Sequence, residues 1–186
     1  MNEHEWDRYS VICYIVKNVA GSNRLGKKAL QKYVYLLKDL KSVDLGYNFR
    51  FYTYGPFSSS LAADIDIAGD FGALAISYNE TDNYYSIMAG PEIDRFIAKG
   101  EQYLAANKSK IDEVLKNFGG RFAKDLELIA TLVFVLKNST ERPMKLNALI
   151  AETHALKPKF SEEKIRRTIN ELTAKKYFKP ISDAKH

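Results

Sequence analysis

The sequence predicts a mainly helical α+β protein, with a winged-helix-like N-terminal half followed by a C-terminal helix-turn-helix-like unit. Three observations lead to this class. Apolar residues recur at helical spacing over most of the chain. Short aromatic runs bounded by turn residues gather between residues 49 and 90. A Gly119-Gly120 pair sets the last third apart. At 186 residues and 46% apolar, the chain is long enough to bury a core.

Two helices are expected first. One covers residues 6 to 20, where apolar residues lie on one face. The second begins near Lys27 with KKALQKYVYLLKDL, and its core stripe leaves a second, more polar side. That side carries Lys28, Gln31, Lys32, Tyr35 and Asp39, and we expect the face of Gln31, Lys32 and Tyr35 to be exposed.

A strand, a helix and a hairpin follow. FRFYTY is expected to form one short strand that closes at Gly55-Pro56, because proline cannot continue a ladder. Ser58 or Ser59 then caps a helix that ends near Gly69 to Gly72. ALAISY and YYSIMAG form a β-hairpin. This order of elements is that of a winged helix, and it assigns residues 1–90 to one domain.

Residues 91–119 are expected to connect the two halves. Pro91 suits the start of a helix that runs past Leu104, and Ser109 starts a shorter one. Residues 120–186 then supply three more helices, the last capped by Ser161, and the short extended piece YFKPI. They form the basic helix-turn-helix-like unit.

Charge separates the two parts of the chain. Up to Gly119 there are 14 basic against 15 acidic residues, and from Gly120 onward there are 14 against 8, so the net charge of +5 comes from the C-terminal third. A basic surface of this kind favours a phosphate backbone or an acidic protein. No run of about 18 apolar residues and no secretory signal pattern is present, so we expect a cytoplasmic protein without a membrane partner.

Catalytic motifs are absent from the sequence. It has three histidines and no GxSxG, HExxH or glycine-rich phosphate loop, and its single cysteine, Cys13, is expected to be buried. No cofactor or metal is therefore expected, and a non-enzymatic role is favoured. One enzymatic alternative stays open, a metal-dependent nuclease that uses Asp64, Asp66 and Asp70.

Those aspartates also bear on nucleic-acid binding, because they lie on the helix that a winged-helix protein inserts into the major groove. Three carboxylates would be repelled by the duplex, so the N-terminal half is expected to bind protein. The last helix and the turn before it are basic instead. Their candidate DNA-contacting residues are Lys157, Lys159, Lys164, Arg166, Arg167, Lys175 and Lys176.

LGKKALQKYVYLLKDL and FRFYTYGPFSSSLAADID resemble the YwgA-like family of small prokaryotic proteins and, more distantly, the Panacea domain of SocA-type antitoxins. The similar positions are Leu30, Gln31, Lys32, Tyr35, Tyr54, Gly55, Pro56, Phe57, Ser58, Leu61 and Asp64. The segment from Leu156 to Leu172 also resembles the YwgA-like C-terminal part. The distant resemblance implies an antitoxin or adaptor module that neutralises a partner.

The Gly-Pro turn and the Ser58 cap would hold Tyr54 and Phe57 beside the polar face of the second helix. This arrangement predicts a polar-aromatic pocket or a purely structural corner. The candidate partner-binding residues are Lys28, Gln31, Lys32, Tyr35, Tyr54, Gly55, Pro56 and Ser58.

Two binding hypotheses follow beside the nuclease. In the first, a winged-helix regulatory protein docks a partner, such as a toxin or regulator, through its N-terminal half, and its C-terminal half is available for DNA. In the second, an antitoxin-like or defence-associated module binds protein alone. A homodimer is the default for a helix-turn-helix protein, because such proteins commonly bind paired half-sites.

Overall fold

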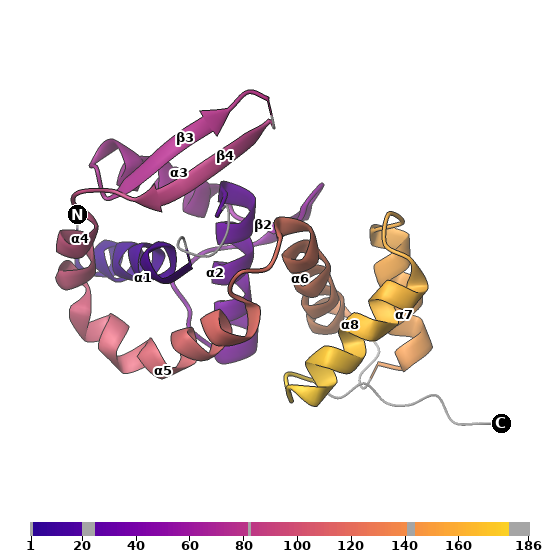
Figure 1. The fold of residues 1–186 in the computed structure, drawn as a ribbon. Helices are drawn as coiled ribbons and strands as arrows, with labels where there is room; N and C mark the ends of the chain where they lie inside the picture. Colours follow the sequence, from indigo (N-terminus) through magenta and orange to yellow (C-terminus); the bar gives the residue numbers. More distant parts are fainter. Residues whose placement is uncertain (1, 20–24, 82, 141–143, 179–186) are drawn as a thin grey trace.

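Helix α2 (Lys27–Lys41) lies at the centre of the molecule, and the elements packed around it are α1 (Glu3–Val19), β2 (Gly55–Phe57), α5 (Glu101–Phe118) and α6 (Ala123–Asn138) (Figure 1). The structure is a computed structural model that describes residues 2–19, 25–81, 83–140 and 144–178. Within these ranges it has eight helices and two two-stranded antiparallel sheets. The mainly helical α+β class predicted from the sequence is therefore confirmed.

The first sheet differs from the prediction, because the Gly-Pro pair lies inside a strand. β1 (Arg50–Tyr52) pairs with β2 (Gly55–Phe57) through a two-residue turn, so FRFYTY does not form a single strand that ends at Gly55. Pro56 faces Phe51, one pair beyond the pair that closes the turn. At alternate pairs of an antiparallel ladder the N–H points away from the partner strand, so proline is tolerated there.

The predicted helix and hairpin after this sheet are confirmed. Helix α3 (Ser59–Asp70) begins at Ser58, whose Oγ accepts a hydrogen bond from the Leu61 N–H at 3.4 Å. β3 (Leu74–Asn79) and β4 (Tyr84–Ala89) then form the second sheet, which rises at the edge of the molecule in Figure 1. The hairpin packs on α1 and α3.

The predicted break before Ser109 is wrong. α4 (Ile93–Lys99) ends at Gly100, and α5 (Glu101–Phe118) continues through Ser109. The break lies at Gly100, where α1 comes close to the backbone. A Cβ on Gly100 would lie 2.5 Å from both Ser10 Oγ and the Trp6 carbonyl oxygen. Both helices of the 91–119 segment pack against α1.

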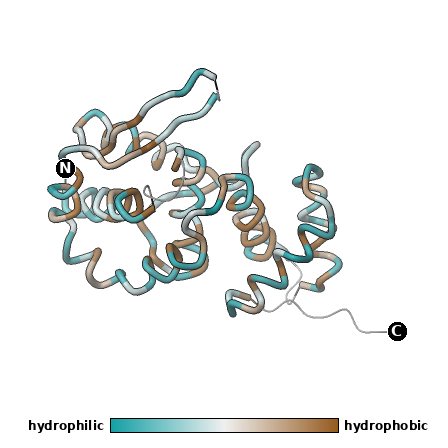
Figure 2. Tube along the Cα trace, in the orientation of Figure 1, coloured by the Kyte–Doolittle hydropathy of each residue, from teal (hydrophilic) through white to brown (hydrophobic). Residues whose placement is uncertain are grey.

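The C-terminal helices are α6 (Ala123–Asn138), α7 (Leu146–Leu156) and α8 (Glu162–Ala174), and α8 is capped by Ser161 as predicted. α6 contacts α2 and β2 on one side and α7 and α8 on the other. Figure 2 shows that α6, which lies between these two groups of elements, is mostly hydrophobic. Of the predicted extended piece YFKPI, Tyr177 and Phe178 are not in a strand, and the rest lies outside the described residues.

A single hydrophobic core cluster includes residues from both halves of the chain, from Tyr9 to Leu172. Cys13 is buried in it, as expected, and burial raises the pKa of its thiol to about 12. None of the helices in the described ranges is long and apolar enough to cross a bilayer.

Candidate functional site

Two side chains of α2 hold the Gly-Pro corner. Gln31 Nε2 donates to the Ser58 carbonyl at 2.9 Å, and Gln31 Oε1 accepts from the Ser58 N–H at 3.0 Å. Lys32 Nζ donates to the Pro56 carbonyl at 2.8 Å. Gly55 makes the turn into β2 with φ of +85°, a conformation that strains residues with a side chain. The corner is thus built by long-range hydrogen bonds as well as by its own sequence.

The expected exposure of the polar face of α2 is wrong. Gln31, Lys32 and Tyr35 expose 3%, 3% and 2% of their surface. The physical reason is that β2 and α6 cover this face, while the backbone of residues 56 to 58 satisfies the Gln31 amide and one donor of the Lys32 ammonium. Of the candidate partner-binding residues on this helix, Lys28 alone remains exposed.

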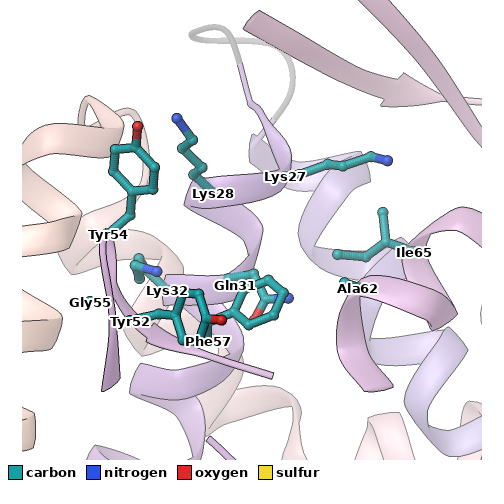
Figure 3. Close-up of a pocket in the computed structure, with 10 residues that line it drawn as sticks. All are labelled: Lys27, Lys28, Gln31, Lys32, Tyr52, Tyr54, Gly55, Phe57, Ala62 and Ile65. Atoms are coloured by element: carbon teal, nitrogen blue, oxygen red, sulfur yellow. The ribbon is translucent and has the colours of Figure 1, made fainter. Parts of the chain in front are cut away.

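An aromatic groove of about 240 Å³ opens between α2, the β1–β2 ribbon and α3 (Figure 3). α3 contributes Ala62 and Ile65 to one wall. The ribbon contributes Tyr52, Tyr54 and Phe57, which are 67%, 48% and 37% exposed. Three large aromatic side chains exposed around one concavity are typical of an interaction site.

Behind the groove, the carboxylate of Glu127 on α6 is buried between two lysines of the turn after α7. Its Oε1 lies 2.7 Å from Lys157 Nζ, and its Oε2 lies 2.7 Å from Lys159 Nζ. Burial opposes the charge of Glu127, but the hydrogen bonds and charges of Lys157 and Lys159 outweigh it and lower the pKa of the carboxyl group. These contacts hold the turn after α7 against α6.

Lys32 lies next to this group. Burial lowers the pKa of its ammonium group to about 8; the charge of Glu127 opposes this shift, while those of Lys157 and Lys28 add to it. Lys32 has no ion pair with Glu127 within 4 Å among the described residues, since the two oxygens of Glu127 pair with the other lysines. The result is a buried cation without a carboxylate partner of its own.

A second cavity, the lysine pocket, of about 230 Å³, adjoins the groove and shares Lys28, Lys32 and Tyr54 with it. Lys124, Lys159 and Glu127 complete its charged lining. Lys28 Nζ lies 3.7 Å from the centroid of the Tyr54 ring, a cation–π distance. The structure thus brings together residues from both predicted sets, Lys28, Lys32 and Tyr54 from one and Lys159 from the other.

The other candidate DNA-contacting residues lie apart from this site. Lys164 Nζ is 2.9 Å from Asp125 Oδ1, and Lys175 Nζ is 3.1 Å from Glu171 Oε1. Arg166, Arg167 and Lys176 are exposed. Arg167 has a 3.5 Å ion pair with Glu163, but both side chains are more than 70% exposed. Neighbouring residues therefore already neutralise much of the positive charge expected on α8.

Two of the aspartates of α3 contact side chains elsewhere in the N-terminal half. Asp64 accepts a 2.6 Å hydrogen bond from the Tyr47 hydroxyl and lies 3.4 Å from Arg8 Nη1, while Asp66 pairs with Lys27. In the described part of the chain, no three His, Cys, Asp or Glu side chains are placed to hold a metal ion. Asp64 instead fastens α3 to α1 and to the loop after α2.

Sequence reasoning missed Glu127 and Lys124. Glu127 had a detectable signal, because it is a charged residue inside the apolar run LELIATLVFVL, where a buried carboxylate needs a cationic partner. Lys124 had none, since a lysine in the first turn of a helix is ordinary at the surface.

No model of a known protein family matches the chain, and no curated protein matches it either.

Proposed function

We propose that the protein is a non-enzymatic binding protein of winged-helix type, which docks an acidic, partly apolar segment of a partner protein in the aromatic groove. The observation that carries the proposal is the exposure of Tyr52, Tyr54 and Phe57 around one concavity. Lys28 at the rim and the lysine pocket behind it make the surroundings positive, which selects for acidic residues beside the apolar anchor.

The order of elements supports the winged-helix part of the proposal. α1, α2 and α3 precede the β3–β4 hairpin, as the three helices of a winged helix precede its wing. α3 would be the recognition helix, and it carries Asp64, Asp66 and Asp70, which disfavour contact with a duplex. Protein docking through the N-terminal half fits this charge better. The resemblance to antitoxin-type domains would make the partner a toxin or a regulator.

A displayed library of acidic peptides, each containing a Phe or Leu, tests the docking proposal. Peptides selected on the full chain should bind with micromolar affinity and lose about tenfold or more on Tyr54→Ala, because aromatic anchors dominate such interfaces. Tyr78→Ala on the hairpin is the matched control, since Tyr78 has the same exposure of 48% as Tyr54. Equal losses for the two variants, or failure to select any peptide, would exclude the groove as the docking site.

DNA binding through the C-terminal half is the second candidate, and the exposed Arg166, Arg167 and Lys176 favour it. Duplex affinity should then fall steeply with salt and weaken on Arg166→Glu and Arg167→Glu. Lys110→Glu on α5 is a control of equal charge change. If the control weakens binding as much as the α8 variants do, the contact is non-specific.

A further inference from the structure

The lysine pocket has more positive charge than the protein itself neutralises. Of the residues that the structure describes, four lysines line it, namely Lys28, Lys32, Lys124 and Lys159, against one carboxylate, that of Glu127. That carboxylate is already shared by Lys159 and by Lys157 behind the pocket. Among the described residues, Lys28, Lys32 and Lys124 have no carboxylate within 4 Å.

Lys32 is the least compensated of these cations. Its side chain is 97% buried, and in the described part of the chain its ammonium group has one hydrogen-bond acceptor, the Pro56 carbonyl. An ammonium group has three donors, and burying its charge without a counterion is costly. An anion in the pocket would supply the missing charge and accept the remaining hydrogen bonds.

The start of α6 adds a further positive contribution. Ala123 and Lys124, the first two residues of the helix, line the pocket, and no side chain caps the helix at Phe122. The first backbone N–H groups of a helix lack partners within it, and the helix dipole makes that end positive. An anion near this end of α6 would be favoured by the helix dipole as well as by the lysines.

The amount of charge indicates which anion fits. The lining carries four ammonium groups and one carboxylate, so a monovalent carboxylate ligand would leave most of the excess uncompensated. A phosphomonoester carries close to two negative charges at neutral pH and has three acceptor oxygens. We propose that the lysine pocket binds the terminal phosphate of a small phosphorylated ligand, with Tyr54 in contact with the group that carries the phosphate.

This site is separable from peptide docking, although the two cavities share a wall. Phe57 lines the groove and not the lysine pocket, whereas Lys159 and Lys124 line the lysine pocket and not the groove. Phe57→Ala should therefore weaken peptide binding and leave phosphate binding unchanged. Lys124→Gln should weaken phosphate binding and leave the binding of a peptide without charged residues unchanged. Each proposal can therefore fail without the other.

Titration calorimetry on the full chain at pH 7, with inorganic phosphate and with phenyl phosphate at constant ionic strength, tests the proposal. We expect saturable one-to-one binding that weakens about tenfold on Lys159→Gln and on Lys28→Gln. Lys110→Gln, on the exposed side of α5, should change the affinity less than about twofold, because it removes the same charge outside the pocket.

Two outcomes would overturn the assignment. If Lys110→Gln and Lys159→Gln weaken binding equally, the effect comes from the net charge of the protein and not from the pocket. If no binding is measured at millimolar phosphate, the pocket is not a phosphate site. Duplex DNA with unphosphorylated ends distinguishes the source of the phosphate. If the duplex competes with phenyl phosphate while inorganic phosphate does not bind, the pocket contacts a nucleic-acid backbone and the phosphomonoester assignment is wrong. Lys32→Met, with folding checked by circular dichroism, should abolish binding.

Discussion

The side-chain amide of Gln31 hydrogen-bonds both the N–H and the carbonyl of Ser58, at 3.0 and 2.9 Å. It thereby gives Ser58, the residue that follows β2, the pair of hydrogen bonds that another strand would otherwise give. Since Ser58 also caps α3 through its Oγ, this one amide connects α2, the ribbon and the start of α3. The groove lies between these same three elements.

Replacing Gln31 should therefore lower the free energy of unfolding by more than the size of this side chain alone would suggest. Gln31→Leu keeps the volume but leaves two buried backbone groups without partners, and we expect the free energy of unfolding to fall by about 2–4 kcal/mol. Urea denaturation measures the change. Gln102→Leu on the exposed side of α5 is the control and should be nearly neutral. A neutral Gln31→Leu would mean that water or a shifted backbone replaces the amide.

Substitutions at Gly55 should destabilise the protein to different degrees, in an order set by the backbone conformation. Its φ of +85° lies in the region that favours glycine, and a Cβ there would meet Thr131 Oγ1 at 3.4 Å. Gly55→Ala should lower the free energy of unfolding by about 1–2 kcal/mol, Gly55→Asn by less, and Gly55→Val by more, because asparagine accepts positive φ and β-branched residues do not. Thermal denaturation of the three variants gives the order. A variant series that follows side-chain volume instead would indicate a steric cause.

The stability of the protein should depend on pH through Lys32, and the lowered pKa of this lysine sets the direction of the dependence. Below pH 8 the lysine is charged in both states, so the folded chain bears the full cost of burying the charge. The folded state loses the proton near pH 8, whereas the unfolded chain keeps it to about 10.5. The unfolded state therefore binds more protons in this window, and the contribution of Lys32 to stability rises with pH.

Comparison with Lys32→Met isolates this contribution, because the other titrating groups are common to both proteins. From pH 7 to pH 10 the wild type should gain about 1–3 kcal/mol relative to the variant in urea denaturation. Glu127 on α6, Lys157 after α7 and Lys28 on α2 are the charges that influence this titration. A difference that stays constant over this range would show that Lys32 keeps its ordinary pKa in the folded protein.

The sequence predicts the local features of this protein well, because they depend on local patterns. Helical spacing located α2, serine caps located the starts of α3 and α8, and aromatic runs located the β3–β4 hairpin. The burial of Gln31 and Lys32 could not be predicted in this way. A polar helix face is buried only if a distant segment offers it acceptors and donors, and here that segment is β2, more than 20 residues away.

The sequence does not predict the break at Gly100 or the role of Glu127, and the reason is the same for both. Glycine within a helical pattern does not reveal that α1 approaches its α-carbon, and a single glutamate does not reveal which lysines meet it. Lys157 and Lys159 looked like part of a basic DNA-binding surface because they adjoin α8 in sequence. In the folded protein they lie at the corner between β1, α6 and the turn after α7, where Lys157 Nζ also donates to the Thr53 carbonyl.

Glu127→Gln should move stability and phosphate binding in opposite directions. Without the carboxylate, the buried Lys157 loses its counterion, and the free energy of unfolding should fall by about 3 kcal/mol. The same change removes the negative charge of Glu127 from the lining of the lysine pocket, so phosphate should bind roughly threefold tighter or more, and the gain should shrink as salt is added. Urea denaturation and phosphate titration on one preparation give both quantities. If both decrease together, Glu127 serves to hold the lysines in position, and its charge does not oppose an anion in the pocket.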